Sequence, residues 1–413
     1  MQPPTNSTPR AELLGDADLA RLTADLENTS EKMTRYILHT AEYERTDRLW
    51  PAHFLVFVTN PLNVAYGACG TALFLHSSRR MRELPGDVIA WMLKQPLSVE
   101  TYPPGLYVGL AGIAYTFLEI GLEEKAEAVM AMLYQSPLLY EEPSMFLGAA
   151  GWGLASLHFF SQTGKQVYLD RAVQAGEHLL QTAQHEGEAC YWRCNQDERV
   201  HYGFGYGASG IALFLTYLHL LTGRADFRTY AMRGLEFDLA NKVETEVGWQ
   251  WKRFQDDTVV YPYWIHGSAG IGSTLIRLYH LLGIERYESL ARQIAEDTFV
   301  KYSFIPSLFE GLAGIGEFML DMFYFTGDVT YRHNAFDIAD TLLWFKIDKP
   351  EGVAYPGRWL TRISNDYATG AAGIGLFFTR LLRPCGYFFV DLNPEAVVGK
   401  RELAQSRSSE SVA

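Results

Sequence analysis

The hydrophobic residues of this chain form short runs that begin with glycines and end in a turn. In the stretch Tyr261–Gly283, small residues at 267–270 precede an apolar run, Ile271–Leu282, which stops at Gly283. The apolar positions recur with a period near 3.6 and few charges interrupt them, which predicts a helix buried on several sides. The glycines at its start let the backbone approach a neighbour closely.

The same unit occurs seven times along the chain. The glycine pairs, each with the pattern G-x-x-G, begin 39 to 60 residues apart and are Gly67–Gly70, Gly109–Gly112, Gly148–Gly151, Gly207–Gly210, Gly267–Gly270, Gly311–Gly314 and Gly370–Gly373. Seven copies, each followed by an apolar helical run, indicate a repeat architecture. None of the pairs is followed by Lys-Ser or Lys-Thr, which excludes phosphate-binding loops of the P-loop type.

An amphipathic pattern alternates with these apolar runs. After Gly164 the apolar and small residues are Tyr168, Ala172 and Ala175, and the same offsets recur after three further glycines. Such offsets lie on one face of a helix, and charges occupy the other face. Each repeat therefore predicts an inner apolar helix and an outer amphipathic helix. Seven stacked hairpins of this kind predict an all-α fold, an α/α toroid (barrel).

We expect these repeats to make one domain. Residues 1–10 are predicted to be a disordered N-terminus, residues 11–393 a single toroid domain, and residues 394–413 a disordered C-terminal tail. Residues 11–48 are expected to be helical and to cover one side of the first repeat. Three long insertions, within 188–207, 248–267 and 352–370, precede an inner helix and so belong at one mouth of the toroid. Their aromatic and β-branched residues predict short strands or ordered loops there.

Composition narrows the function. The net charge of −13 argues against nucleic-acid binding, which needs basic patches. No apolar run reaches the roughly 18 residues of a membrane span, and the polar start of the chain lacks the apolar centre of a signal peptide. Four cysteines in 413 residues do not form a disulfide framework, so we expect a cytoplasmic location.

The sequence around several of the glycine pairs is similar to that of a known protein family. The segments FGYGASGIALFLTYLHLLTG, FEGLAGIGEFMLD and ATGAAGIGLFF resemble the lanthionine synthetase C-like (lantibiotic cyclase) family, and in particular the cyclase domain of class III lanthipeptide synthetases. The resemblance covers most of the chain and implies an α/α toroid of seven helical hairpins. In class III synthetases a lyase and a kinase domain precede the cyclase domain. Here the toroid is expected to use nearly the whole chain.

The resemblance also implies zinc ligands, and this chain departs from the family at those positions. Where zinc-dependent members have one cysteine and a Cys-His pair, this chain has Ile265, Phe309 and Glu310. The positions of the family's other His, Asp and Arg hold Tyr206, Ser144 and Tyr261. Because isoleucine and phenylalanine have no donor atom for zinc, we expect no metal and no cofactor. Class III cyclase domains share this loss.

The reaction of the family adds a peptide cysteine thiol to a dehydroalanine or dehydrobutyrine. Near neutral pH only a few per cent of a free thiol is ionised, and the adduct is an enolate that needs a proton. By repeat symmetry the residues just before each first glycine surround the mouth, and three consecutive repeats supply Tyr206, His266 and Glu310. We predict that His266 accepts the thiol proton, Glu310 orients it and Tyr206 protonates the enolate. The alternative is that all three are polar rim residues that satisfy loop backbone.

Two further groups of residues have alternative interpretations. Four tryptophans near the mouth either pack the loops or form an aromatic wall that binds a peptide substrate: Trp192, Trp249, Trp251 and Trp264. Cys190, Cys194 and His201 match a metal site weakly, and incidental cysteines are the favoured interpretation.

Three functions remain open from the sequence. The first is a zinc-independent, cyclase-like enzyme of ribosomal peptide (lanthipeptide) modification that acts on a dehydrated precursor peptide. The second is a non-catalytic scaffold that binds the precursor peptide, with a separate kinase or lyase as partner. The third is a carbohydrate-active α/α barrel in which Glu310 is the acid.

Overall fold

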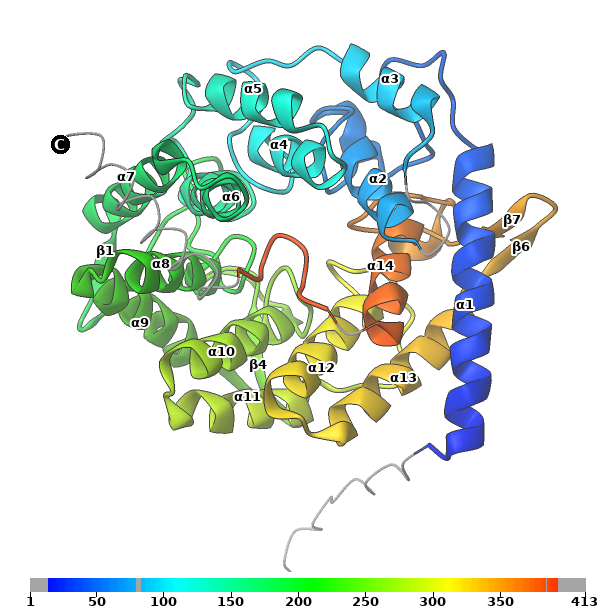
Figure 1. Cartoon of the computed structure of the whole chain (residues 1–413). Coiled ribbons are helices and arrows are strands. Elements are labelled where there is room, and N and C mark those ends of the chain that lie inside the picture. Colours follow the sequence, from blue (N-terminus) through cyan, green and yellow to red (C-terminus); the bar gives the residue numbers. More distant parts are fainter. Residues whose placement is uncertain (1–13, 79–82, 384, 393–413) are drawn as a thin grey trace, which may run out of the picture.

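The computed structural model describes residues 14–78, 83–383 and 385–392, and the helices of this part form two concentric rings (Figure 1). The predicted disordered ends, 1–10 and 394–413, lie outside the described residues. The inner ring has seven helices, each starting directly after the first glycine of a pair: α2 (Ala68–Ser77), α4 (Leu110–Glu119), α6 (Ala149–Thr163), α8 (Ala208–Thr222), α10 (Ser268–Leu282), α12 (Leu312–Thr326) and α14 (Ala371–Leu382). The predicted toroid is confirmed.

Six outer helices follow the inner helices along the chain, and a seventh comes from the N-terminus. The six are α3 (Gly86–Lys94), α5 (Glu123–Leu133), α7 (Gln166–Thr182), α9 (Ala225–Ala240), α11 (Glu285–Thr298) and α13 (Val329–Leu343). The seventh is α1 (Asp16–His39), which packs against α13 and α14 (Figure 1). The sequence placed this helix over the first repeat, but the structure pairs it with the last inner helix. The seventh pair of helices is therefore made by α1 and α14, which are the first and last helices in the described part of the chain. The ring closes in this way, without the polar caps of an open array.

A closed ring of backbone hydrogen bonds joins the seven repeats. In every repeat the residue two positions before the first glycine donates its N–H to the carbonyl of the equivalent residue in the next repeat. The donors and acceptors, in order, are Ala65 to Tyr107, Tyr107 to Phe146, Phe146 to Gly205, Gly205 to Ile265, Ile265 to Phe309, Phe309 to Ala368 and Ala368 to Ala65. Since these groups are buried at the centre of the fold, each needs its partner. Because the ring closes on itself, none of the seven N–H groups or carbonyls is left unpaired.

The second glycine of each pair is required by the same backbone. A Cβ atom at Gly270 would lie 2.1 Å from the carbonyl oxygen of Trp264, and one at Gly314 would lie 2.1 Å from that of Leu308. No side chain fits at such distances, so the inner helix can approach the loop before it only with glycine there. This is the physical origin of the repeated G-x-x-G.

The three insertions form short antiparallel strands, as predicted. The first pairs β1 (Gln184–Glu186) with β2 (Ala189–Tyr191), and the last pairs β6 (Ile347–Lys349) with β7 (Gly352–Ala354). The middle one makes three strands, β3 (Val243–Thr245), β4 (Gly248–Lys252) and β5 (Val260–Tyr261). The single-turn helices η1 (Phe54–Phe57) and η2 (Arg358–Leu360) complete the loops.

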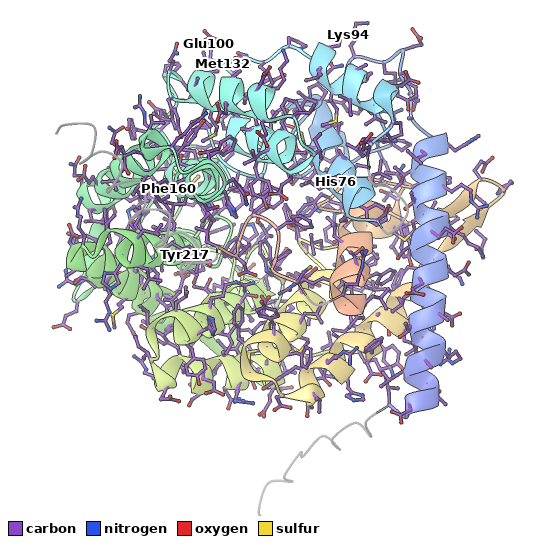
Figure 2. The ribbon with its side chains drawn as sticks, viewed as in Figure 1. His76, Lys94, Glu100, Met132, Phe160 and Tyr217 are labelled. Carbon is purple, nitrogen blue, oxygen red and sulfur yellow. The ribbon has the colours of Figure 1, made fainter. Side chains whose placement is uncertain are left out.

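Aromatic side chains close the hole of the toroid. The ring of Tyr107 lies 5.2 Å from that of Phe309 and 5.8 Å from that of Phe389. Phe389 belongs to the last described segment, residues 385–392, which crosses the centre of the ring (red in Figure 1). Figure 2 shows side chains filling this space, and Tyr217 of α8 donates a hydrogen bond to the Val390 carbonyl at 3.1 Å. In the described part of the chain, the centre of the toroid is therefore packed with side chains and holds no open channel.

A network of buried charges fastens this segment to the inner helices. Arg277 of α10 donates to both carboxylate oxygens of Asp321 at 2.6 and 2.8 Å, and to Asp391 at 2.6 Å. Arg380 of α14 reaches Asp321 and Glu317, each at 2.6 Å. Two arginines thus cross-link α10, α12 and α14 and hold the C-terminal segment in place.

Candidate functional site

A pocket of about 180 Å³ lies where the loops before the inner helices meet. Five of its lining residues directly precede the first glycine of a pair: Tyr66, Tyr206, His266, Glu310 and Thr369. Four others belong to the closed ring of backbone hydrogen bonds: Phe146, Ile265, Phe309 and Ala368. The structure therefore brings the three predicted residues Tyr206, His266 and Glu310 into one pocket. Its walls carry polar groups, and its floor is apolar.

The rings of Tyr206 and His266 are stacked in the wall of the pocket. Their centroids are 5.0 Å apart and their planes differ by 5°. Burial lowers the pKa of His266 to about 3, so the imidazole is neutral near pH 7. Its Nδ1 has no hydrogen-bond partner within the described part of the chain. Burial raises the pKa of Tyr206 well above its usual value, so the phenol keeps its proton. The pair therefore offers one proton acceptor, the unpartnered Nδ1 of His266, and one proton donor, the Tyr206 O–H group.

Glu310 is paired with an arginine that the sequence analysis missed. Arg358 Nη2 lies 2.9 Å from Glu310 Oε2. Across the described residues, no hydrogen bond connects Glu310 to His266, so the predicted orienting role of Glu310 has no support in this geometry. Arg358 comes from η2, where the next two residues, Trp359 and Leu360, have φ of 59° and 57°. Such strain in bulky residues collects at functional sites.

A histidine that the sequence did not single out lies next to the pocket, beside Tyr66, together with an aspartate; neither of them lines the pocket itself. The ring of His53 lies 5.4 Å from that of Tyr66, and its backbone N–H donates to Asp366 at 2.9 Å. Asp366 also accepts the backbone N–H of Thr369 at 2.7 Å, and so fixes the loop before α14. His53 lies before the first glycine pair and occupies no repeated position, so repeat symmetry could not reveal it.

The four tryptophans mostly pack the loops. Trp264 is fully buried below the pocket, 4.6 Å from the ring of Phe204. Trp251 and Trp192 are also buried, and their indole N–H groups donate to backbone carbonyls of the outer helices at 2.6 and 2.8 Å. Trp249 is half-buried under the ammonium group of Lys242. None of the four lines the pocket, so the geometry favours the loop-packing interpretation.

The residues present do not fit a zinc ion at the family position. Ile265, Phe309 and Glu310 all line the pocket, so the three positions lie together in space. Glu310 alone has a donor atom, and that carboxylate already binds Arg358. Since zinc needs three or four ligands, this pocket cannot hold it by these side chains.

The structure groups different residues than the Cys190, Cys194 and His201 considered from the sequence. Cys190 lies in β2, and its sulfur contacts the carbonyl of Tyr230. Cys194 lies beside His201, as considered from the sequence, but the third member of the cluster is Asp197 and not Cys190. His201 adjoins the pocket wall, with its ring 5.3 Å from that of Tyr206.

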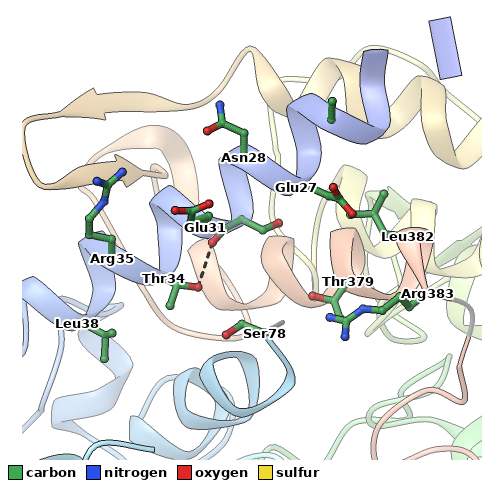
Figure 3. A pocket seen from close by; sticks show the side chains of 12 residues that line it. Glu27, Asn28, Glu31, Thr34, Arg35, Leu38, Ser78, Thr379, Leu382 and Arg383 are labelled. Carbon is green, nitrogen blue, oxygen red and sulfur yellow. Dashed lines mark hydrogen bonds between the residues drawn. The ribbon is translucent and has the colours of Figure 1, made fainter. Parts of the chain in front are cut away.

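A larger cavity, of about 780 Å³, lies away from these groups. It is bounded by α1 and the end of α14, with Thr34, Arg35 and Thr379 among its lining residues (Figure 3). Its lining comes from α1 and from the C-terminal ends of α2 and α14, and no residue of the loops at the mouth takes part. We therefore place the candidate site at the smaller pocket.

An acidic side chain behind the pocket gives a pH-dependent prediction. Asp238 of α9 accepts hydrogen bonds from the backbone N–H groups of Gly203 and Ser209, and so anchors the loop that carries Tyr206. Burial raises the pKa of Asp238 to about 7. Between its unfolded pKa near 3.9 and this value only the folded state holds the proton, so the free energy of unfolding falls as pH rises.

Replacing Asp238 by asparagine removes this titration. We expect the stability of Asp238→Asn relative to wild type to increase by about 3 kcal/mol between pH 5 and pH 8. Urea unfolding at the two pH values measures it. A difference between the two proteins that stays constant with pH would contradict the assignment of the proton to Asp238.

The fold and the pocket define a class: closed α/α toroids with a polar site at the entrance to the inner helices. The family model described as "Lanthionine synthetase C-like protein" matches residues 59–387. The chain belongs to this family.

Relatives and solved structures agree with this assignment. The chain is 28% identical over 380 residues to "Probable SapB synthase" of Streptomyces coelicolor, covering 89% of this chain and 39% of that protein. It thus spans well under half the length of this relative. "Nisin cyclase" has the same fold, with a TM-score of 0.63, 13% identity and coverage of 93% and 98% of the two chains. The Lin0763 protein from Listeria innocua aligns with a TM-score of 0.53, 11% identity and coverage of 92% and 98%. Within the described part of the chain, no helix is long and apolar enough to cross a bilayer.

Proposed function

We propose that this protein catalyses the cyclase step of lanthipeptide modification, the addition of a cysteine thiol to a dehydrated residue of a precursor peptide, without zinc at the family position. One observation carries the proposal. Tyr206, His266 and the Glu310–Arg358 pair face a single pocket, and that pocket contains the positions where the family resemblance places zinc. Membership of the lanthionine synthetase C-like family supplies the class of reaction.

The size of the pocket suits a side chain and excludes a folded peptide. With about 180 Å³ and an aromatic floor that includes Phe146 and Phe309, it admits the reacting thiol and alkene while the peptide backbone lies across the mouth. The seven inner helices begin at this mouth, each contributing roughly half a positive charge. Their dipoles favour the two anions of the reaction, the thiolate and the enolate.

Proton transfer in this pocket has to be coupled to bond formation. Moving a proton from a thiol with pKa near 8.5 to an imidazole with pKa about 3 costs several kcal/mol, roughly 7. The unpartnered Nδ1 of His266 therefore takes the proton as the carbon–sulfur bond forms. Tyr206 gives its proton to the α-carbon of the enolate, and solvent exchange returns both groups to their starting states. One proton is taken and one is delivered.

The test is the loss of free thiol from a dehydrated peptide that contains cysteine. We expect faster loss with wild-type protein than with buffer, and a product of unchanged mass that no longer reacts with a thiol reagent. Equal rates with protein and buffer, across several peptides and with candidate partners added, would contradict the enzymatic proposal.

The pH profile of this reaction provides a second prediction. Because His266 and Tyr206 do not titrate between pH 5.5 and 8 and the thiol reacts with its proton in place, no reacting group changes its charge in this range. We expect kcat/KM to stay nearly constant from pH 5.5 to 8. A tenfold fall per pH unit would show that only free thiolate reacts, and would contradict the role of His266 as proton acceptor.

The scaffold function is the second candidate, and the apolar residues Ile265 and Phe309 at two zinc positions favour it. In that case the toroid binds the precursor peptide for a separate kinase or lyase.

The carbohydrate-active alternative has no such support. Glycoside hydrolysis uses two carboxyl groups, and the pocket lining contains one, Glu310, in an ion pair. The four cysteines are free, which agrees with a reaction carried out in the reducing cytoplasm.

A further inference from the structure

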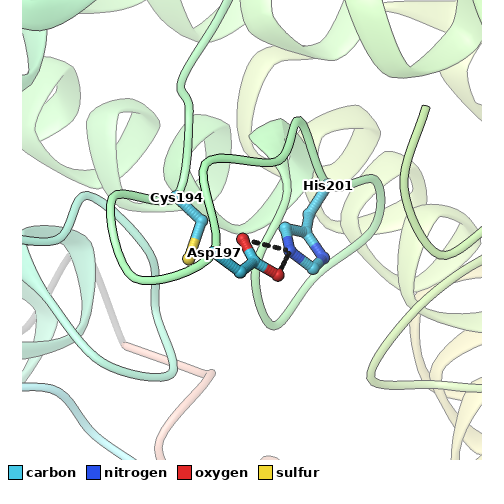
Figure 4. A group of neighbouring side chains, drawn as sticks. All are labelled: Cys194, Asp197 and His201. Carbon is cyan, nitrogen blue, oxygen red and sulfur yellow. Dashed lines mark hydrogen bonds and ion pairs between the residues drawn. The ribbon is translucent and has the colours of Figure 1, made fainter. Parts of the chain in front are cut away.

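A second cluster of chemically active side chains lies outside the pocket, in the loop between β2 and α8. Cys194, Asp197 and His201 each direct one potential ligand atom toward the others, and these atoms all lie within 4.8 Å of one another (Figure 4). His201 Nε2 is 3.0 Å from Asp197 Oδ2. Cys194 and His201 are buried, and Asp197 is exposed. A sulfur, a nitrogen and an oxygen donor thus lie together, and the Asp197 side of the cluster is exposed to solvent.

The loop backbone is folded around the sulfur. The Cys194 N–H donates to the carbonyl of Arg199 at 2.9 Å, which closes the loop between the cysteine and the histidine. The backbone N–H groups of Gln196 and Asp197 point at the Cys194 sulfur and favour its thiolate form. Such N–H groups stabilise a sulfur that carries negative charge. The residues Asn195 to Val200 therefore form a preformed turn under a potential thiolate.

The charges around the cluster lack a cation of matching strength. The carboxylate of Glu142, itself about nine-tenths buried, lies beside Cys194 and accepts the Asn195 N–H at 3.2 Å. Among the described residues, the guanidinium of Arg199 lies 4.0 Å from Asp197, but its side chain is half exposed. A divalent cation in the cluster would displace the thiol proton and neutralise both carboxylates.

One polar atom in the cluster is also left without a partner. Nδ1 of His201 is buried and has no hydrogen bond within the described part of the chain. Its other ring nitrogen, Nε2, faces Asp197. Buried polar groups are normally satisfied, so His201 has an unused ring nitrogen beside the cluster.

We propose that Cys194, Asp197 and His201 bind one divalent transition-metal ion that accepts mixed sulfur, nitrogen and oxygen ligands, such as Zn²⁺. Three protein ligands and an open position are typical of zinc sites that keep a water molecule. Tetrahedral ligands would stand roughly 3.3–3.8 Å apart at normal zinc–ligand distances. The ligand atoms here lie between 3.0 and 4.8 Å apart, so binding requires side-chain shifts of about 1 Å or less. The site is separate from the positions Ile265, Phe309 and Glu310, and it does not depend on the proposed cyclase reaction.

Cobalt titration tests this site directly, because a thiolate bound to Co²⁺ gives an intense near-ultraviolet charge-transfer band. The protein is stripped with a chelator and titrated with Co²⁺, then with Zn²⁺ as competitor. We expect the band to saturate at one equivalent and to disappear when Zn²⁺ is added. The readout is independent of activity, so its failure would leave the cyclase proposal untouched.

Variants identify the ligands. Cys194→Ser is expected to abolish the band, and Asp197→Asn, an exposed substitution that leaves the fold intact, to weaken Co²⁺ binding by at least 10- to 100-fold. Cys190→Ser and Cys385→Ser are the matched controls and should keep the band. No band at several equivalents, or a band that survives in Cys194→Ser and is lost in Cys385→Ser, would overturn the proposal. Thermal unfolding of each variant shows that it is folded.

Discussion

Replacing Arg277 by alanine is expected to lower the free energy of unfolding by about 3–5 kcal/mol, one of the two largest effects that the structure predicts. The guanidinium is buried, and it binds Asp321 through two hydrogen bonds and Asp391 through another. Burial alone would raise the pKa of Asp321, but Arg277 and Arg380 outweigh it and hold that pKa below its usual value. Removing Arg277 leaves a buried carboxylate with half its partners.

The matched control for this substitution is Arg286→Ala on the neighbouring outer helix. Arg286 pairs with Glu236 at 2.6 Å, but its side chain is 61% exposed. Solvent-exposed pairs contribute about 0–1 kcal/mol, so this variant should unfold close to wild type. Urea denaturation of both variants measures the difference. Equal effects would show that the buried network does not hold the C-terminal segment as described.

Replacing His266 by alanine is expected to slow ring formation by about 10²- to 10⁴-fold, the range for loss of a positioned proton acceptor. The side chain lines the pocket, and its unused Nδ1 is the acceptor proposed for the thiol proton. The loss should shrink at high pH, where the peptide thiol ionises without help. His280→Ala is the matched control, because that exposed histidine lies near the other end of the following helix, α10.

Outcomes of the His266 experiment separate enzyme from scaffold. Thiol loss is followed with wild type, His266→Ala and His280→Ala, and peptide binding is measured in parallel. Full activity in His266→Ala would keep the enzyme and remove His266 as its acceptor. Unchanged binding with lost ring formation is the result that the catalytic role requires.

The helices and the mouth were predictable because their signals are local. The period of the run after Gly267 defines a buried helix, and the repeated glycine pair places His266 and Glu310 in equivalent positions. Long-range pairing has no such signal. The chain's pattern does not say that α1 pairs with α14, or that Phe389 fills the hole. These contacts depend on closure of the ring, which joins residues far apart in sequence.

Residues of the insertions were the hardest to assign. Arg358 follows a glycine in a loop without repeat equivalents, and only the folded loop brings it to Glu310. Cys194 and Asp197 are three positions apart, but a turn was needed to direct both toward His201. In the same way, the position of Trp264 before Gly267 does not reveal the direction of its side chain, which packs against Phe204 in the core.

The stereochemistry of the product tests the central claim, that the mouth pocket performs the addition, most directly. Protonation of the enolate creates a stereocentre at the α-carbon, and in this pocket the proton comes from one side, from Tyr206 in the wall. Chiral analysis of the hydrolysed product should therefore show one lanthionine diastereomer with wild-type protein. It should show a mixture, formed slowly, with buffer or with Tyr206→Phe. The same mixture of diastereomers with wild-type protein as with buffer would contradict the account.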